Sequence, residues 1–263
     1  VQANVRNRPS VDRAVAGSSA VINLVAIMHE SGRQRFDAVH DFGARAIAQA
    51  AAQAGIDRFV HVSAIGAYEG SDSSYARSKA VGEAGARAAI ASAIIMRPSI
   101  IFGPEDAFFN RFAAIARLSP VIPLIGADTK FQPVFVGDVA QAVAVAIDGD
   151  AHAGTTYELG GPDVASFREL MEKMLQIVER KRILLPVPFP LARLKAMFLQ
   201  LLPNPLLTVD QVKLLAHDNI VSDQAIAEGR TLSGLNIQAR GMDAILPTYL
   251  ERFRRAGQFE TAR

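Results

Sequence analysis

The stretch "SSYARSKAVGE", residues 73–83, places a tyrosine and a lysine four residues apart. Positions i and i+4 share one face of a helix, so Tyr75 and Lys79 can point into one pocket. A nearby ammonium lowers the pKa of a tyrosine, and the hydroxyl of Ser63, twelve residues earlier, could hold a substrate oxygen. These groups could move a proton while a nicotinamide moves a hydride. Three interpretations stay open: a working proton-transfer pair, a cofactor clamp without turnover, or two side chains on an ordinary solvated helix.

The sequence around these residues alternates buried strands with helices. Continuous apolar runs predict strands buried on both faces, at 19–27, 58–67 and 93–104. The helical spacing of apolar residues predicts helices over 36–55 and 73–91. This order is typical of an α/β protein with a parallel sheet. Ser63 would lie at the carboxyl end of a strand, where open parallel sheets form their ligand crevice.

Beyond residue 104 the pattern changes and predicts a smaller lobe. Ser166 and Glu169 have the spacing of a capping box, which would begin a helix over 166–181. The segment "PVIPLIG", residues 120–126, reads as a proline-rich loop. The other expected elements are an amphipathic helix over 107–119, a short strand entering a helix within 130–147, and a strand over 156–162.

Composition excludes several classes of protein. The chain has 263 residues, a net charge of +2 and no cysteine. The small net charge gives no argument for nucleic-acid binding, and the lack of cysteine rules out disulfides, thiolate metal sites and cysteine nucleophiles. The five histidines form neither an i,i+4 pair nor an HExxH motif, so we expect no metal site. No uninterrupted apolar segment reaches the roughly 18 residues that a membrane-spanning helix needs.

Several segments resemble the extended and atypical short-chain dehydrogenases/reductases. They are "INLVA", "RFVHVSAIGA", "YARSKAVGE", "RPSIIFGPED" and "FQPVFVGDVAQAV", in the order of that family. One branch is more closely similar, the NADPH-binding accessory subunit of respiratory complex I, NADH:ubiquinone oxidoreductase. This closer resemblance is carried by "SSYARSKAVGE", "RPSIIFGPEDAFFNRFA", "LPVPFPL", "LTVDQVKLLAHDN" and "LSGLNI". It implies an incomplete, doubly wound Rossmann domain over residues 1–165 and a mainly helical C-terminal lobe over 166–263, with some elements exchanged between the two.

The resemblance also implies the adenine side of a dinucleotide site, matched position by position. Asn4 and Val5 would lie where the family's adenine-side strand ends. Leu24, Val25 and Ala26 would end the next strand, where the backbone passes a ribose of the cofactor. For Leu24 and Val25, a place in the hydrophobic core is an equal alternative.

The nicotinamide side follows from the same matching. Ser63, Tyr75 and Lys79 match the family's catalytic serine, tyrosine and lysine, and the last two would also hold the nicotinamide ribose. The strand end beside the nicotinamide would be formed by Pro98, Ser99 and Ile100. For Pro98 and Ile100, a place in the core is again an equal alternative.

One feature of the family is not found in this sequence. The family begins with a glycine-rich GxxGxxG turn and a helix whose N-terminus takes the pyrophosphate. No such motif occurs here, and the opening "VQANVRNRP" resembles the end of the family's third strand. We therefore expect roughly 60 residues of such a fold, the length of two βα units, to be missing from the start of this chain. The dinucleotide affinity of the chain alone should then be poor.

The proline-flanked stretch "PVPFPLARLKAMFLQLLPNPLL", residues 186–207, has a second kind of pattern. A helix over 190–202 would be apolar around most of its circumference, with Arg193 and Gln200 on a polar edge and Lys195 within the apolar side. Two interpretations are open. The stretch could form the core of the small lobe, or a surface that meets lipid headgroups or a membrane subunit.

Two function hypotheses follow. The first is an accessory subunit of complex I that holds NADPH, with NAD(H) as the alternative, without turnover, near the junction of the peripheral and membrane arms and the quinone site. Its partners would be other complex I subunits and a membrane surface at 186–207, on the cytoplasmic side of a bacterial inner membrane or the matrix side in mitochondria. The second is a free NAD(P)-dependent reductase or nucleotide-sugar epimerase/dehydratase that uses Ser63, Tyr75 and Lys79. A dinucleotide-sensing regulator is a third, less specific hypothesis.

Overall fold

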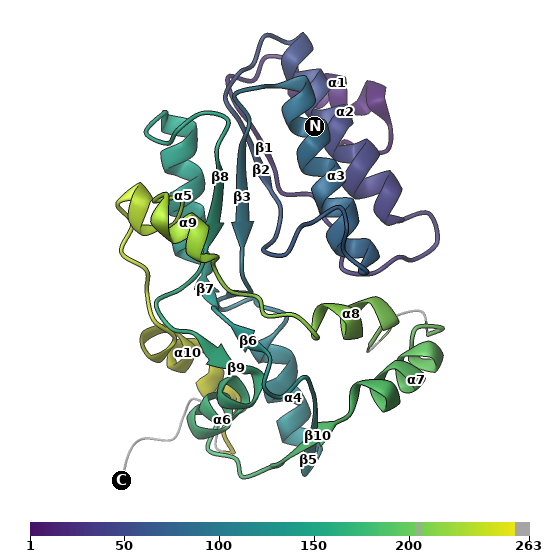
Figure 1. The fold of residues 1–263 in the computed structure, drawn as a ribbon, viewed down its shortest axis with the longest axis vertical. Coiled ribbons are helices and arrows are strands. Elements are labelled where there is room, and N and C mark those ends of the chain that lie inside the picture. Colours follow the sequence, from purple (N-terminus) through teal and green to yellow (C-terminus); the bar gives the residue numbers. More distant parts are fainter. Residues whose placement is uncertain (203–204, 206, 256–263) are drawn as a thin grey trace.

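A four-stranded parallel sheet forms the centre of the upper half of the molecule in Figure 1. The computed structural model describes residues 1–202, 205 and 207–255. The strand order is β1-β2-β3-β8, with β1 (Val21–Asn23), β2 (Phe59–Val62), β3 (Ile94–Pro98) and β8 (Thr156–Leu159). The register pairs Val21 with Phe59 and Val60 with Ile94. Because all pairings are parallel, the carboxyl ends of the strands share one edge, which faces the lower half (Figure 1).

Helices cover both faces of this sheet, as the alternating pattern predicts. The helices on one face are α1 (Arg8–Val15), α2 (Phe42–Gln53) and α3 (Ser74–Ala89), and α5 (Val136–Asp148) covers the other. Phe59 and Ile95 belong to the core under α1 to α3, whereas Val60 and Met96 belong to the core under α5. Successive residues of a strand thus enter different cores, so both faces of the sheet are buried. The predicted α/β class with a doubly wound parallel sheet is confirmed.

Small residues allow α3 to approach the start of α2 closely. A π-helical turn, η1 (Asp37–Asp41), precedes α2 and carries His40. A Cβ atom at Gly82 of α3 would lie 2.3 Å from the carbonyl oxygen of His40, so only glycine fits there. Ala44 and Ala48 of α2 are fully buried at this contact layer. The close approach fixes His40 against the helix that carries Tyr75 and Lys79.

The lower half has a separate core, built from distant parts of the chain. Phe102, Phe109, Phe131 and Phe167 belong to it. Its helices are α4 (Phe109–Leu118), α6 (Phe167–Ile177), α10 (Met242–Leu250) and the 3-10 turn η3 (Glu251–Phe253). Two small pairings support it, β4 (Ile101–Phe102) with β7 (Val134–Phe135) and β6 (Lys130–Phe131) with β9 (Ala165–Ser166). The predicted capping box of Ser166 and Glu169 is present at α6.

The segment 120–126 is not the loop that its prolines suggest. Strand β5 (Val121–Ile125) pairs in parallel with β10 (Ile183–Val187), at the bottom of Figure 1. Each strand contains a proline, Pro123 in β5 and Pro186 in β10. A two-stranded ribbon has two free edges, and a proline facing such an edge removes no ladder hydrogen bond. The loop prediction was therefore wrong, because the segment 120–126 becomes a strand by pairing with β10, which its own sequence does not reveal.

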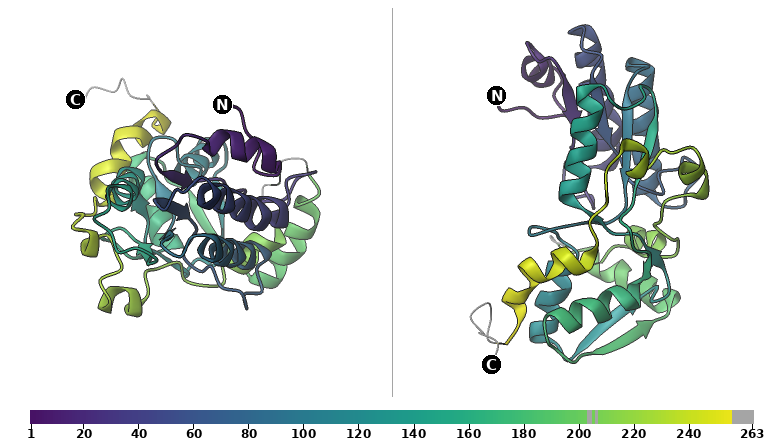
Figure 2. Two further views of the ribbon diagram at one scale, coloured as in Figure 1. Left: turned by 90° about the horizontal axis from the view of Figure 1, so that it is seen from above. Right: turned by 90° about the vertical axis from the view of Figure 1, so that its left-hand side faces the viewer.

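The segment between β10 and α10 begins at the right of Figure 1 and crosses to its left, between the two halves of the molecule. Its elements are α7 (Phe189–Leu199), α8 (Val209–Leu214), α9 (Asp223–Ala227) and the 3-10 turn η2 (Ser233–Leu235). Ala192 and Ala196 of α7 pack with Val212 of α8. Figure 2 shows the two halves stacked along the long axis, with the N-terminus at the upper half. Within the described residues, no helix combines the length and hydropathy needed to cross a bilayer.

The helix predicted over 190–202 forms as α7, but it is not a core helix. Only its two alanines, Ala192 and Ala196, are buried. Its large apolar side chains are exposed, with Leu194 at 53% and Phe198 at 68%. The interpretation of this stretch as the core of the small lobe is therefore wrong for α7. Positions 203, 204 and 206 of the predicted stretch lie outside the described residues.

Candidate dinucleotide site

Lys79 lies in the middle of α3 and its amine is buried at the end of β2. The side chain is 2% exposed, and Nζ donates a 2.8 Å hydrogen bond to the carbonyl oxygen of Val62, the last residue of β2. Burial lowers the pKa of Lys79 to about 8, against an opposing effect of the Glu83 carboxylate. The amine is thus held in place by the main chain of the sheet.

Tyr75 lies in the first turn of α3 and packs in an aromatic cluster. Its ring meets His40 edge to face, with centroids 5.5 Å apart, and Phe36 at 5.9 Å. Burial raises the pKa of Tyr75 to about 12. The expectation that Lys79 would lower this pKa is wrong here, because burial dominates and the Lys79 amine is bonded to Val62 instead. The phenol is therefore neutral at physiological pH.

Ser63 follows β2 directly, at the carboxyl edge of the sheet. Its hydroxyl is buried and has no hydrogen-bond partner within the part of the chain that the structure describes. A buried hydroxyl without a partner is unfavourable by about 1–3 kcal/mol. Such a group is suited to receive a ligand oxygen or a water.

A second buried group without a partner among the described residues is Nε2 of His61, which lies on β2 two residues before Ser63. Asn23 Oδ1 accepts from the amide of Val25, so Asn23 Nδ2 must be the group that meets His61 Nδ1 at 3.0 Å. An amide nitrogen donates, so Nδ1 accepts and the proton of neutral His61 sits on Nε2. Burial, then the charge of Lys79, lowers the pKa of His61 to about 3. His61 is thus a neutral donor beneath the sheet edge, and Asn23 shapes the strand end at Val25.

His40 connects the chain after β1 with α3. Its Nε2 accepts a 2.9 Å hydrogen bond from the amide of Ile27. Its Nδ1 must then carry the proton and donate to Ser78 Oγ at 2.9 Å, and this hydroxyl donates to the carbonyl oxygen of Tyr75. Burial, then Lys79, lowers the pKa of His40 to about 4, which keeps this tautomer neutral.

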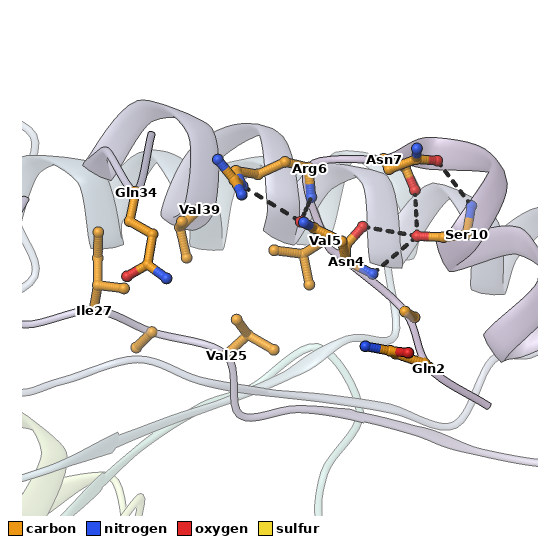
Figure 3. A pocket seen from close by; sticks show the side chains of 12 residues that line it. Gln2, Asn4, Val5, Arg6, Asn7, Ser10, Val25, Ile27, Gln34 and Val39 are labelled. Carbon is orange, nitrogen blue, oxygen red and sulfur yellow. Dashed lines mark hydrogen bonds between the residues drawn. The ribbon is translucent and has the colours of Figure 1, made fainter. Parts of the chain in front are cut away.

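A cavity of about 700 Å³ lies beside Ile27 (Figure 3). Asn4, Val5, Val25 and Ala26 line it, together with residues such as Arg6 and Gln34. Figure 3 shows the side chains of Asn4, Arg6 and Asn7 on one side of the cavity and those of Val25 and Ile27 on the other. Leu24, in contrast, is 66% exposed and does not line the cavity. The structure therefore brings together four of the five residues predicted for the adenine side.

The residues predicted beside the nicotinamide, 98–100, do not line the cavity. The hydroxyl of Ser99 is buried and donates to Oδ1 and the carbonyl oxygen of Asn219, at 2.7 and 2.9 Å. Ile100 packs against the core of the lower half, and Pro98 is buried. Pro98 and Ile100 therefore lie in or against the hydrophobic core, which was the alternative interpretation for them. For Leu24 and Val25 it is wrong, because both are exposed.

The described residues fit the two ends of a dinucleotide. The cavity offers apolar side chains and amides for a base and ribose. Lys79 and the hydroxyl of Ser63, which has no partner among the described residues, are the groups expected at the nicotinamide ribose. His40 and Ile27 join the two regions. The sequence contains no GxxGxxG turn for the pyrophosphate. No group of three or more acidic or histidine side chains that could hold a metal is found within the described residues.

Sequence reasoning did not identify several residues of this site. His40, Asn23 and His61 lie in ordinary apolar segments, and no motif signals that their side chains meet. Asn219 and Asp210 come from the far end of the chain, and only the fold brings them to strand ends and to α3. A histidine within a buried strand, such as His61, is the one available signal, because such a side chain needs a partner.

Comparisons with known proteins also indicate a nicotinamide-dinucleotide-binding protein. A family model described as NAD(P)H-binding matches residues 1–99. The chain is 36% identical over 233 residues to NADH dehydrogenase (ubiquinone) 1 alpha subcomplex subunit 9, mitochondrial, of Arabidopsis thaliana, which covers 84% of this chain and 58% of that protein. It is 28% identical over 255 residues to the mitochondrial NADH-ubiquinone oxidoreductase 40 kDa subunit of Neurospora crassa, covering 97% and 66% respectively. The chain thus spans somewhat more than half the length of these relatives.

A solved structure shows the same fold. DesIV, a dTDP-glucose 4,6-dehydratase from Streptomyces venezuelae with NAD and TYD bound, has a TM-score of 0.72 over 97% of this chain and 79% of that chain. The identity is 20%, so this likeness concerns the fold alone. Together with the sequence matches, it confirms the resemblance found in the sequence: the chain is similar over most of its length to the subunit 9 and 40 kDa proteins of respiratory complex I, and it has a Rossmann-type fold.

Proposed function

We propose that this protein is an accessory subunit of respiratory complex I that holds a nicotinamide dinucleotide as a fixed component and does not turn it over. The observation that carries the proposal is that Tyr75 is packed among aromatic rings and the amine of Lys79 is bonded to the main chain of β2. Burial raises the pKa of Tyr75 to about 12, whereas a general acid or base works best with a pKa near the operating pH. Lys79 is anchored to Val62, which suits a clamp on a ribose. Electron transfer from NADH to quinone would be the work of other subunits.

The finer parts of the proposal concern the cofactor and the place of the subunit. NADPH is the proposed dinucleotide, with NADH as the competitor. The proposed place is the junction of the peripheral and membrane arms near the quinone site, at the inner face of the inner membrane. The names of the two relatives, both complex I subunits, support membership in that assembly. We also propose the domain division at residue 165, with 102–131 contributing to the C-terminal lobe, because these residues share its core.

The stretch 186–207 is the proposed docking surface. Leu191, Leu194, Met197 and Phe198 of α7 are all exposed and give one short helix an unusually apolar outer surface. Arg193 and Lys195 on the same helix have no salt-bridge partner among the described residues. Apolar side chains with interspersed cations suit a membrane surface with anionic headgroups, or an acidic partner subunit.

One observation favours a second candidate function, a free NAD(P)-dependent reductase or nucleotide-sugar epimerase/dehydratase. The hydroxyl of Ser63 is buried without a partner in the described chain and lies at the ligand edge of the sheet. A carbonyl substrate could accept its hydrogen bond. This candidate predicts turnover by the isolated protein, with Tyr75 as the acid.

The deciding experiment separates detergent-solubilised membranes under native conditions. Co-migration of the protein with a large NADH-oxidising assembly is the expected result, and a small soluble species with reductase activity would favour the second candidate. The full-length protein should also release NADP(H) when it is denatured. The absence of any nucleotide from purified full-length protein would overturn the fixed-cofactor role.

A further inference from the structure

The first turn of α3, the helix of Tyr75 and Lys79, is capped by two residues that lie far apart in sequence. Ser73 is the N-cap, and its hydroxyl accepts from the amide of Ala76 at 3.3 Å. The amides of Ser74 and Tyr75 have no acceptor in their own helix. The carboxylate of Asp210, from α8, accepts both of them, at 2.7 Å through Oδ1 and 3.0 Å through Oδ2. Its Oδ2 also accepts from the hydroxyl of Ser73 at 2.8 Å.

The charge of Asp210 suits this position as well as its geometry does. The N-terminus of a helix carries a partial positive charge, so a carboxylate there is favourable. Charge-assisted hydrogen bonds to backbone amides are about twice as strong as neutral ones. The hydroxyl of Ser73 accepts only the amide of Ala76, and Asp210 supplies the acceptors for the two preceding amides, those of Ser74 and Tyr75. All three free amides of the first turn are therefore bonded to side chains.

Helix α8 is itself held from both sides. Thr208 and Gln211 form a capping box at its start, and Val212 packs against the buried alanines of α7. Lys213 Nζ donates to the carbonyl oxygen of Asp72 at 2.8 Å, just before α3. Further along, Asn219 donates from Nδ2 to the carbonyl oxygen of Ile65, beyond the end of β2. The segment from Thr208 to Asn219 is thus seated on the edge of the sheet that carries the candidate site.

We propose that Asp210 is a positioning residue for the Tyr75–Lys79 pair, acting from the C-terminal lobe as a cap on α3. The inference rests on the proposed role of the pair as a dinucleotide clamp. When α8 is seated, the first turn of α3 is ordered and Tyr75 is fixed beside His40 and Phe36. When α8 moves away, the amides of Ser74 and Tyr75 lose their acceptor. Retention of the dinucleotide therefore depends on the seating of α8, and through the α7–α8 contact on the exposed helix α7.

The test compares Asp210→Ala and Asp210→Asn with Asp218→Ala in the full-length protein. Asp218 is a matched control, because its Oδ1 accepts a backbone amide, that of Lys130 at 2.8 Å, from the same segment without touching α3. The first measurement is hydrogen exchange of the amides of residues 74–76 without nucleotide. The second is the rate at which bound NADPH leaves the protein, with circular dichroism as the check on folding.

We expect Asp210→Ala to speed amide exchange at 74–76 and NADPH release by roughly tenfold, the factor that corresponds to the loss of a helix cap. Asp210→Asn keeps one acceptor oxygen and should recover part of both effects, whereas Asp218→Ala should change neither. Unchanged exchange in Asp210→Ala, or an equal effect in Asp218→Ala, would overturn the cap. Faster exchange with unchanged NADPH release would overturn the positioning role. If wild-type protein binds no NADPH while exchange still responds to Asp210, the cap stands and the proposed function fails.

Discussion

The amine of Lys79 is bonded to the carbonyl oxygen of Val62, so the helix that carries the candidate clamp is tied to the last residue of β2. Ser63, whose hydroxyl has no partner in the described part of the chain, is the next residue. The bond therefore sets the distance between the clamp and the ligand edge of the sheet. Because a buried lysine amine must satisfy its hydrogen bonds inside the protein, this carbonyl and a ligand hydroxyl are its natural partners.

Lys79→Ala should weaken retention of the dinucleotide by the full-length protein. The variant removes a hydrogen bond from a charged group, worth roughly 1.5–3 kcal/mol, so the dissociation constant should rise at least tenfold. Equilibrium dialysis with NADPH measures the change. Lys173→Ala is a suitable control, because Lys173 pairs with the exposed Asp243 in the other half of the molecule. Equal affinity of Lys79→Ala and wild type would contradict the clamp.

Tyr75→Phe separates a clamp from a catalyst. A phenol whose pKa is raised to about 12 by burial is a poor proton shuttle at neutral pH. The quinone reductase activity of an assembly that contains the variant should therefore stay close to that of wild type. The measurement is NADH-dependent quinone reduction by the purified assembly, with the nucleotide content checked in parallel. A fall by orders of magnitude with nucleotide still bound would identify Tyr75 as a working acid.

The sequence predicts the parts of this fold that depend on local pattern. The apolar runs that become β2 and β3, and the i,i+4 spacing of Tyr75 and Lys79 on α3, are visible without any structure. The burial of both faces also follows, because the runs lack a polar alternation. What the pattern does not reveal is length. The run at 19–27 contributes only the three residues of β1, because the strand ends at Asn23, whose Oδ1 accepts the amide of Val25, and residues 25–27 line the cavity instead.

The rest of the site depends on contacts between distant segments. Asp210 is 135 residues from Tyr75, and Asn219 is 120 residues from Ser99. No local rule indicates that these residues meet. No local rule predicts the pairing of β5 with β10 either. The prolines of both segments disfavour strands, and only the contact between the two segments makes them strands. The exposure of Leu194 and Phe198 could not be predicted locally either. The sequence predicts an apolar helix, but only the structure shows that these side chains lie outside the core.

The stability of the protein should fall as the pH drops below about 6.5. Burial lowers the pKa of His61 to about 3 and of His40 to about 4, so between these values and 6.5 the unfolded chain binds protons that the folded protein does not. The free energy of unfolding then decreases by up to about 1.4 kcal/mol per pH unit for each histidine. Urea unfolding at a series of pH values measures this slope. His61→Gln should flatten it and the exposed His152→Gln should not, whereas a flat wild-type profile would contradict the buried neutral state.

The ion pair between Arg97 and Glu83 should matter for stability. Arg97 Nε and Nη2 donate to the two carboxylate oxygens of Glu83 at 2.9 and 2.6 Å, and the Glu83 side chain is almost fully buried. Arg97→Met leaves that carboxylate buried without its partner, which destabilises by roughly 3–5 kcal/mol. Glu83→Leu combined with Arg97→Met should recover much of the loss in urea unfolding. The pair of Arg230 and Glu228, in which the carboxylate of Glu228 is exposed, is the control, and Glu228→Gln should change stability by less than about 1 kcal/mol.

The final prediction concerns the exposed apolar side of α7. Leu194 and Phe198 lie one helical turn apart and are both more than half exposed, so Leu194→Glu with Phe198→Glu should leave the fold intact. Burying each side chain against a partner would be worth roughly 1.5–3 kcal/mol, which is enough to decide docking. The double variant should therefore fold, by circular dichroism, and fail to sediment with membranes or to join the assembly.

Two further variants make this test specific. Ala192 and Ala196 face α8, so Ala196→Glu should disturb folding where the surface variant does not. Arg193→Gln with Lys195→Gln should weaken membrane association at low salt and have less effect at high salt, because ions screen the attraction to anionic headgroups. A surface double variant that unfolds would show that Leu194 and Phe198 support the lobe itself. One that folds and still docks would place the interface on another part of the molecule.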